Sequence, residues 1–435
     1  MRIAILNWRD LTHPDGGGAE RYAANIATGL VLRGHEVTLL CADHGAAPRD
    51  ETVDGVRFRR RGGRVGVYPQ ALRGVHRLEH TEGRFDVVVD VQNGLPFLSP
   101  LATSTPVVCL VHHVHREQWP IVFGPLAAMI GWGIESRVSP WVYRARQYVA
   151  VSGRTKDELA ELGVQASHIA VIHNGTDEPT STDAARSPHP TIVVLGRLVP
   201  HKRVEHAIDV LAKLAESHPD LRLRIIGDGW WAPTVRAHAQ ACGVTDRVAC
   251  LGFVSEKRKH AELAAAWVAL APSIKEGWGL NVVDAASHGV PTVAYHGAGG
   301  LSESIEDGLT GLLVQDLDAM AAAVSKLLSD QPLRDSLGSA AREHAARFTW
   351  EATIASWEDL LKHVANNGAP VSTTDAGQSS TALLEAAPIA MSAAVGDDLP
   401  GIQHVARTGL NGNLVVGTIA VDHSLDCENG CATSE

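Results

Sequence analysis

The sequence predicts an α/β protein in which two Rossmann-like, doubly wound domains face each other across a cleft. Short apolar runs alternate with helical patterns over the first 365 residues, which is typical of parallel sheets covered by helices on both faces. The chain has 435 residues, which is more than one ordinary hydrophobic core contains. A stretch rich in proline, serine and threonine at residues 178–190 separates two similar halves.

In the first half, strands alternate with helical patterns from the first residues onward. A glycine-rich turn, Gly16–Glu20, joins the first strand to a helix at Ala19–Arg33 that ends at Gly34. The expected strands are Ile3–Asn7, His35–Cys41, Val56–Arg60, Val87–Val91, Val107–Val111 and Tyr148–Val151.

The second half repeats this organisation, and a segment of different composition follows it. From residue 366 onward, Gly, Ser, Thr and Ala dominate and acidic residues outnumber basic ones, so we expect a largely disordered tail in which only Leu414–Val421 is compatible with a strand. The expected strands of the second half are Thr191–Leu195, Leu221–Ile226, Val248–Leu251, Val268–Ala271 and Thr292–Tyr295, and its helices are Val204–Ser217, Pro233–Cys242, Lys257–Ala266 and Leu280–Ser287.

Composition and charge narrow the class of protein. The apolar fraction of 45% and the net charge of −11 describe an ordinary globular protein and argue against nucleic-acid binding, which usually requires a basic face. No apolar run reaches the roughly 18–20 residues of a membrane span, and the first strand is too short for a signal peptide. We therefore expect a cytosolic protein. Of the six cysteines, four lie in or beside apolar runs, while Cys427 and Cys431 are either unpaired tail thiols or a redox or metal pair.

Residues 273–300 are the most informative stretch for function. A strand is followed by the glycine-rich loop Lys275–Gly279 and then by a helix start. Backbone N–H groups and the helix dipole make such a turn an anion site, and glycine lets a phosphate approach closely. Two carboxylates, Glu276 and Asp284, flank this site. A phosphate site bordered by carboxylates suits a ligand that is part phosphate and part polyol, as a nucleotide sugar is.

Two further loops follow strand ends. Arg197 and Lys202 lie in a loop after Thr191–Leu195, where they are either solvated or, in view of the second anion site in the same half, paired on a diphosphate. Gly17 and Gly18 follow the first strand, where ligands bind in doubly wound sheets, although a tight turn without a ligand is equally compatible. The turn lacks the G-x-G-x-x-G pattern, which disfavours a dinucleotide oxidoreductase.

Three histidines follow the strand Val107–Val111, a position that suits a catalytic or sugar-positioning side chain. Adjacent His112 and His113 point to opposite faces, and no cysteine lies beside them, which disfavours zinc. Asp316 and Asp318 precede a helix, so they are interpreted as solvated or as a helix cap. We therefore expect no metal dependence.

A basic cluster follows the second strand. It is either a solvated edge or a contact with an anionic membrane or acceptor. Its members are Arg57, Arg59, Arg60, Arg61 and Arg64, followed by Arg73 and Arg77 on an expected helix.

These motifs resemble the retaining glycosyltransferases of family 4 (group 1), which have the GT-B fold, over nearly all of residues 1–365. The family element E-G-F-G-L-x-x-x-E is similar to Glu276-Gly277-Trp278-Gly279-Leu280-Asn281-Val282-Val283-Asp284, in which Asp284 stands where the family usually has Glu. Gly196-Arg197-Leu198 with Lys202 resembles the family's diphosphate site, and Gly17-Gly18-Ala19-Glu20 resembles its N-domain loop. Val151-Ser152 and Val171–Asp177 are similar to the family's approach to the hinge. His112 resembles its strand-end histidine, and Trp350–His363 resembles its last helix.

The resemblance implies roles for these residues. Arg197 and Lys202 would neutralise the leaving diphosphate, Glu276 would bind sugar hydroxyls, Asp284 would bind the ribose, and the nucleotide base would lie near Phe253-Val254. His112 would position the donor sugar. The expected catalytic residues are His112, Glu276, Arg197 and Lys202, and the expected donor-binding residues are Gly17, Gly18, Arg197, Lys202, Val254, Glu276, Gly277, Gly279, Leu280 and Asp284.

The implied activity is metal-independent, retaining transfer of a hexose from a UDP- or GDP-sugar to a glycan, lipid or small-molecule acceptor, without a cofactor. The alternatives are a degenerate sugar-nucleotide-binding protein without turnover and a GT-B epimerase. The protein would be cytoplasmic, with the inner face of the membrane as an alternative site of contact through Arg57–Arg77. The expected segments are an acceptor domain (1–180), a linker (181–190), a nucleotide-sugar domain (191–349), a crossover helix (350–365) and the tail (366–435).

Overall fold

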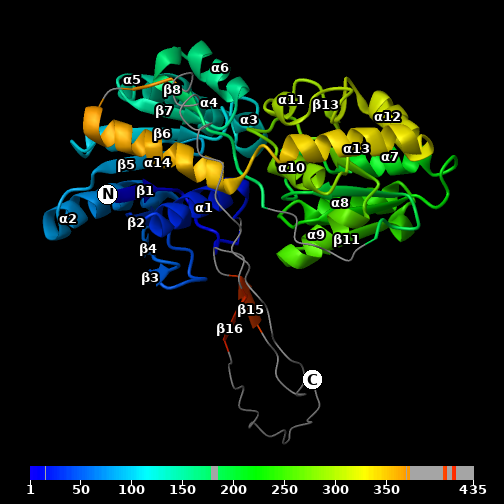
Figure 1. Cartoon of the computed structure of the whole chain (residues 1–435), viewed down its shortest axis with the longest axis horizontal. Helices are drawn as coiled ribbons and strands as arrows, with labels where there is room; N and C mark the ends of the chain where they lie inside the picture. The colour runs from blue at the N-terminus through cyan, green and yellow to red at the C-terminus, as the bar shows by residue number, and fades with distance from the viewer. Residues whose placement is uncertain (15, 178–184, 369, 373–404, 409–413, 418–435) are drawn as a thin grey trace, which may run out of the picture.

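The computed structural model describes residues 1–14, 16–177, 185–368, 370–372, 405–408 and 414–417. Two sheets, one in each half of the chain, lie beside each other and are covered by helices (Figure 1). The predicted α/β class with two Rossmann-like domains is confirmed.

The first sheet has eight strands in the order β3-β4-β2-β1-β5-β6-β7-β8. All neighbouring strands are parallel except β3 and β4, which form an antiparallel pair. The strands β3 and β8 were not predicted, because one is a short edge strand and the other has three residues. The strands are β1 (Arg2–Leu6), β2 (Glu36–Cys41), β3 (Asp50–Val53), β4 (Val56–Arg60), β5 (Val87–Gln92), β6 (Val107–Val111), β7 (Gln147–Ala150) and β8 (Ile169–Val171).

Helices of the first half cover this sheet and extend beyond it. The α1 helix begins directly at the predicted glycine-rich turn, while α3, α4 and α5 were not predicted at all. The helices are α1 (Gly18–Leu32), α2 (Gly63–Glu82), α3 (Trp119–Val122), α4 (Pro125–Gly133), α5 (Ser139–Val142) and α6 (Gly153–Glu161), with a π-helical turn at Ile134–Val138.

The second sheet has six parallel strands in the order β11-β10-β9-β12-β13-β14. In chain order, β10 and β11 are added on one side of β9, whereas β12, β13 and β14 are added on its other side. The strand order therefore reverses between β9 and β12. The strands are β9 (Thr191–Leu195), β10 (Arg222–Ile226), β11 (Val248–Gly252), β12 (Val268–Ala271), β13 (Thr292–Tyr295) and β14 (Gly311–Val314). The helices are α7 (Glu205–Leu214), α8 (Ala232–Ala241), α9 (Glu256–Ala265), α10 (Leu280–Ser287), α11 (Leu301–Ser304), α12 (Leu317–Ser329) and α13 (Gln331–Ala345).

The α14 helix (Trp350–Asn367) leaves the second half and packs across the first sheet (Figure 1). Trp357 is buried, and its indole N–H donates to the Tyr22 hydroxyl of α1 at 2.5 Å. Apolar side chains of both halves share this core, including Trp278 and Val283 of the second half. The two halves therefore form a continuous hydrophobic contact.

The first residues of the predicted disordered tail are ordered in the structure. The α14 helix runs to Asn367, two residues beyond the expected end, and the backbone of Val371 exchanges hydrogen bonds with the Gln147 side chain at 2.7 and 3.0 Å. The expected strand is confirmed in part as β16 (Leu414–Gly417), which pairs antiparallel with β15 (Val405–Thr408). The other residues of the predicted disordered tail lie outside the described residues. In the described chain, no helix has both the length and the apolarity to cross a membrane.

Candidate active site

The reversal between β9 and β12 opens a crevice at the carboxyl ends of these strands, where doubly wound sheets bind their ligands. The crevice holds a small hollow. Two loops border it, one from β9 and the other from β12. The lining residues are Val194, Leu195, Gly196, Arg197, Lys202, Val204, Leu270, Ala271, Pro272, Ser273 and Asn281. The structure thus brings both predicted diphosphate-binding cations to one cavity.

Glu276 lies beside this hollow and forms an ion pair with Lys202. It also accepts a hydrogen bond from the Ser273 hydroxyl at 2.7 Å. Burial alone would raise the pKa of the Glu276 carboxyl, but the Lys202 ammonium and the hydrogen bonds outweigh burial and hold this pKa below its ordinary value. Glu276 is therefore a carboxylate that is held ready to accept hydrogen bonds from hydroxyl groups.

The loop between Glu276 and α10 lies directly against the first domain. A Cβ atom on Gly277 would overlap the carbonyl oxygen of His112, so only glycine fits there. Gly279 precedes α10 with φ of 95°, a left-handed conformation that also favours glycine. The Gly300 N–H donates to the Glu276 carbonyl at 2.9 Å, which fixes the start of the loop. Gly277 therefore serves a close approach between the two domains, and Gly279 serves the left-handed turn into α10.

His112 follows β6 and has a buried side chain with an edge-on contact to Tyr22. Its Nε2 atom is buried without a hydrogen-bond partner among the described residues. Burial lowers the pKa of this imidazole to about 4, against a weaker opposing effect of Glu20. Near neutral pH, His112 is therefore an uncharged group with an unsatisfied nitrogen, which a ligand hydroxyl would satisfy.

The glycine-rich turn after β1 contacts the second domain as well. The Gly17 N–H donates to the Glu20 carboxylate at 2.7 Å, and Arg9 pairs with the same carboxylate at 3.2 Å. A Cβ atom on Gly17 would lie 3.0 Å from Nε of Arg197, and one on Gly18 would lie 3.2 Å from Leu280. The turn therefore lies against Arg197 and Leu280 of the second domain.

Asp284 differs in its surroundings from Glu276. It is buried and does not line the hollow. Its carboxylate lies 3.2 Å from Lys259 and 3.7 Å from Arg21, and it accepts from the Thr176 hydroxyl at 3.1 Å. Burial would raise the pKa of Asp284, but Lys259 and Arg21 lower it below the ordinary value. Its ribose-binding role stays a prediction.

The predicted base-binding pair is split by the structure. The Phe253 side chain is exposed, while Val254 packs against a small apolar cluster around Val193 and Leu263. Trp278, which stands in the family element, is buried between the rings of His173 and Phe348 at centroid distances of 4.4 and 4.8 Å. Trp278 therefore packs at the connection between the domains.

Several charged contacts across the domains were missed from the sequence. Lys275 pairs with Glu117 at 3.1 Å and with Glu158 at 2.9 Å. Glu303 accepts hydrogen bonds from the first two N–H groups of α6, and the distance from Gly153 is 2.8 Å. No local pattern marks these pairs, because the partners are more than 100 residues apart along the chain.

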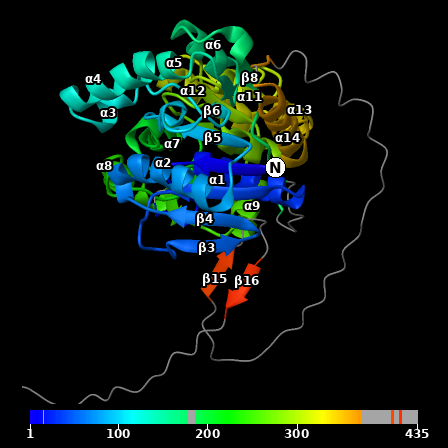
Figure 2. The same cartoon turned by 90° about the vertical axis from the view of Figure 1, so that its left-hand side faces the viewer.

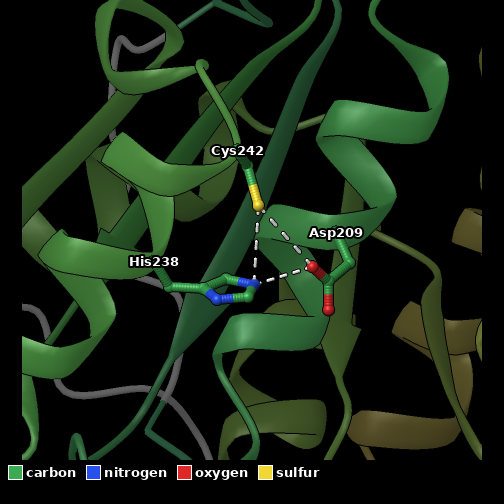
Figure 3. A group of neighbouring side chains, drawn as sticks. All are labelled: Asp209, His238 and Cys242. Carbon is green, nitrogen blue, oxygen red and sulfur yellow. Dashed lines mark hydrogen bonds and ion pairs between the residues drawn. The ribbon is translucent and has the colours of Figure 1, made fainter.

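The described residues include two groups of side chains with metal-binding chemistry. Asp209 of α7 and His238 and Cys242 at the end of α8 point toward one another (Figure 3), and their closest atoms lie 2.7 to 3.8 Å apart. None of the three lines the hollow. This N, O and S set would suit Zn²⁺, but its members satisfy one another by hydrogen bonds. The other group, Asp177, Glu256 and His260, shares its space with the cations Arg21 and Lys259.

Other candidate groups have structural partners. The Asp316 carboxylate accepts from the Ala319 N–H at 2.8 Å and caps α12, as predicted, while Asp318 pairs with Lys213 at 2.8 Å. Most members of the basic cluster are neutralised by carboxylates. The pairs are Arg57 with Glu82, Arg59 and Arg61 with Asp50, and the buried Arg60 with Asp10 and Glu51.

The close packing at Gly277 predicts that Gly277→Ala will lower both stability and activity. The added methyl group must push the loop away from His112, which is expected to lower the free energy of unfolding by about 1–3 kcal/mol. Thermal unfolding checks this, with Gly66→Ala as the control, because a Cβ there meets no atom within 4 Å. Equal melting temperatures for Gly277→Ala and the unsubstituted protein would show that the loop does not pack in this way.

Two family models match the two halves of the chain. The model described as "Glycosyltransferase Family 4" matches residues 16–178. The model described as "Glycosyl transferases group 1" matches residues 181–344 and so contains Arg197, Lys202, Glu276 and Asp284.

Curated relatives cover different shares of the chain. A glycogen synthase of Mycobacterium tuberculosis is 28% identical over 402 residues, which are 82% of this chain and 93% of the relative. A GDP-mannose-dependent α-(1-6)-phosphatidylinositol monomannoside mannosyltransferase of the same species is 33% identical and covers 49% of this chain and 60% of its own. An exopolysaccharide phosphotransferase of Streptomyces coelicolor is 38% identical over 49% of this chain, but the match spans only 23% of that relative.

Solved structures share the fold at low sequence identity. Sucrose-phosphate synthase from Thermosynechococcus elongatus superposes with a TM-score of 0.71 at 18% identity and covers 83% of this chain and 98% of its own. Anabaena HepE, solved in complex with UDP and glucose, gives a TM-score of 0.65 at 20% identity and covers 83% and 99%.

Proposed function

The chain belongs to the group 1 glycosyltransferases with the GT-B fold, and on this premise we propose that it transfers a hexose from a UDP- or GDP-sugar to an acceptor. We propose further that the transfer retains the anomeric configuration, requires no metal ion and takes place in the cytoplasm. One relative is a GDP-mannose-dependent enzyme and one structural neighbour was solved with UDP. The proposal therefore leaves the base and the sugar open, together with the choice of a glycan, lipid or small-molecule acceptor.

The observation that carries the proposal is the pairing of a cationic hollow with a neutral histidine. Arg197 and Lys202 line the hollow, and Glu276 beside it contacts Lys202. The adjacent Gly277 lies on the backbone of His112, whose Nε2 is buried and unsatisfied. A diphosphate suits the two cations, and sugar hydroxyls suit the carboxylate and the uncharged imidazole.

In the proposed reaction, the bond between C1 of the sugar and the phosphate oxygen breaks while a bond from C1 to the acceptor oxygen forms. Arg197 and Lys202 stabilise the negative charge that develops on the leaving diphosphate. His112 accepts a hydrogen bond from a donor-sugar hydroxyl and positions the sugar. The acceptor proton passes to the departing phosphate oxygen.

The composition of the hollow bears on how a retained configuration would arise. Among the described residues that line it, none is a carboxylate, so no lining side chain offers the nucleophile of a double-displacement mechanism. Attack from the face of the departing phosphate is the remaining route to a retained configuration. The anomeric coupling constant of the product, measured by proton NMR, tests this step.

Two alternatives make different use of the same cavity. A degenerate binding protein would bind nucleotide sugars without turnover, and an epimerase would convert one nucleotide sugar into another without an acceptor. Incubation with UDP- and GDP-hexoses separates the three functions, because only a transferase or a slow hydrolase releases nucleoside diphosphate together with a sugar product. Binding without release of nucleoside diphosphate would favour the degenerate protein.

Metal independence leads to a direct prediction. EDTA is expected to leave the rate of transfer unchanged within about twofold, because Arg197 and Lys202 supply the positive charge that a metal ion would otherwise provide. Initial rates with EDTA and with added Mg²⁺ or Mn²⁺ provide the measurement. A loss of activity in EDTA that Mn²⁺ restores would contradict the proposal.

The proposed function does not include the membrane contact expected at Arg57–Arg77. Carboxylates pair with four arginines of this region, namely Arg57, Arg59, Arg60 and Arg61, which reduces its attraction for anionic lipids.

A further inference from the structure

The surface of α3, α4 and the turns that follow them carries an unusual concentration of apolar side chains. Eight of the fifteen exposed large apolar side chains of the described chain fall between residues 121 and 141. Leu126, Met129 and Trp141 are 67%, 65% and 62% exposed. We call this set the apolar surface. It consists of Ile121, Val122, Phe123, Leu126, Met129, Ile130, Val138 and Trp141.

The α4 helix buries the opposite kind of face from an ordinary surface helix. Its small residues Ala128 and Gly131 are buried, while its large residues Leu126, Met129 and Ile130 are exposed. A helix on a globular core normally buries its large apolar residues. Figure 2 shows α3 and α4 projecting to one side of the first sheet. The exposed face therefore has no partner in the described protein.

The segment is held in place by buried contacts. Glu135, which is 1% exposed, accepts hydrogen bonds from the Trp119 indole at 2.6 Å and from the backbone and ring of His115 at 3.1 and 2.9 Å. A Cβ atom on Gly131 would overlap the Trp119 ring. The exposure of the large side chains is thus part of the folded structure.

Within the segment from Trp119 to Arg146, the exposed charged side chains have one sign. Between Trp119 and Arg146, the only acidic residue is the buried Glu135. Arg137 and Arg144 are exposed, and the Arg144 guanidinium lies 5.5 Å from the Trp141 ring. Within the described chain, neither arginine forms an ion pair. Apolar side chains beside unpaired arginines match the boundary between lipid chains and anionic headgroups.

We propose that the apolar surface docks the protein on a lipid bilayer that contains anionic headgroups. The apolar side chains of α3 and α4 enter the headgroup–acyl boundary, and Arg137 and Arg144 contact lipid phosphates. A two-fold dimer through the same face is disfavoured, because it would bring the unpaired arginines of two copies close to each other.

The location of the surface relates it to the active site. The apolar surface begins nine residues after His112, and Glu135 ties it to the loop that carries His115. Docking would bring the loop that carries His115 close to the bilayer. This position suits an acceptor with a lipid anchor. Only this statement about the acceptor rests on the proposed function; the docking itself does not.

Flotation of the full chain with vesicles tests the proposal. Binding to vesicles of phosphatidylcholine and phosphatidylglycerol in equal parts should exceed binding to phosphatidylcholine alone and should fall with added salt. The triple variant Leu126→Asp, Met129→Asp and Ile130→Asp is expected to lose binding by about tenfold or more. Arg137→Ala with Arg144→Ala is expected to remove the preference for the anionic lipid.

Matched controls separate docking from general apolar exposure and from misfolding. Leu32→Asp and Leu309→Asp replace exposed leucines elsewhere, with 74% and 54% exposure, and should bind vesicles like the unsubstituted protein. Unchanged thermal unfolding of the triple variant shows that it is folded. The proposal is overturned if the unsubstituted chain ignores anionic vesicles, if the triple variant floats equally well, or if the triple variant only converts a dimer into monomers in light scattering. Vesicle binding without any donor turnover would overturn the proposed function alone.

Discussion

Replacing Lys202 by alanine is expected to lower kcat/KM for sugar transfer by about 10²–10³-fold, because one of the two cations facing the leaving diphosphate is lost. The same change leaves the Glu276 carboxylate, whose side chain is only 13% exposed, without its ionic partner. An unpaired buried charge destabilises a fold by about 3–5 kcal/mol, so the melting temperature should fall as well. Initial rates and thermal unfolding of the purified variant measure both effects.

The double variant Lys202→Ala with Glu276→Gln separates catalysis from stability. Removing the unpaired negative charge of Glu276 should restore much of the lost stability, while the rate of transfer should remain as low as in Lys202→Ala. Lys213→Ala is a matched control, because Lys213 is a lysine of the same domain that pairs only with Asp318 on the surface. Recovery of transfer in the double variant would mean that Lys202 acts only through folding.

The Lys202–Glu276 pair also predicts a dependence of stability on pH. The pKa of Glu276 is lower in the folded protein than its ordinary value, so the pair stabilises the fold above the unfolded pKa of about 4.3. This contribution is lost as the pH falls through the lower, folded pKa. In Lys202→Ala the pKa should instead rise, and lowering the pH to about 4 should then reduce the stability difference between the variant and the unsubstituted protein.

The second large effect is expected at His112. His112→Ala should lower kcat by about 10- to 100-fold, which corresponds to the loss of one buried hydrogen bond to the donor sugar. Since the side chain touches the first-domain core as well, thermal unfolding must accompany the rates. His76→Ala on the exposed face of α2 is the control. Unchanged rates in a folded His112→Ala protein would remove this residue from the donor site.

The lowered pKa of His112 leads to a further expectation for the dependence of rate and stability on pH. Its pKa of about 4 keeps the imidazole neutral throughout the range of about pH 6–8, so this residue should contribute no inflection to the rate there. The unfolded chain takes up a proton near pH 6.5, whereas folded His112 does so only near pH 4. Stability should therefore decrease as the pH falls between these values, and His112→Ala should weaken that decrease.

The loops of the second domain could be predicted because the carboxyl ends of parallel strands meet at one edge. Arg197 and Lys202 follow one predicted strand, and Glu276 follows another, so a correct list of strands was enough to place them together. The family resemblance is confirmed by a family model whose match spans these residues. The short β3 strand was not predicted, because its four residues alternate between exposed and half-buried positions at a sheet edge.

Contacts between the domains could not be predicted from local patterns. Asp284 meets Arg21, and Lys275 meets Glu117, through a packing of domains that no spacing in the sequence encodes. The basic cluster was a candidate for membrane contact because the sequence did not reveal its ion pairs. The partner carboxylates, Asp50 and Glu82, come from other elements. The α4 helix was missed because its inner face holds only small residues, which leaves no helical apolar stripe.

Release of nucleoside diphosphate from a panel of UDP- and GDP-hexoses, with mass spectrometry of the sugar product, tests the central proposal most directly. One donor is expected to yield nucleoside diphosphate and either a glycosylated acceptor or, in its absence, free hexose at a lower rate. Lys202→Ala should form both products at rates lower by about 10²–10³-fold. Tight binding of a donor that stays intact, or its conversion to a second nucleotide sugar, would contradict the assignment of a transferase.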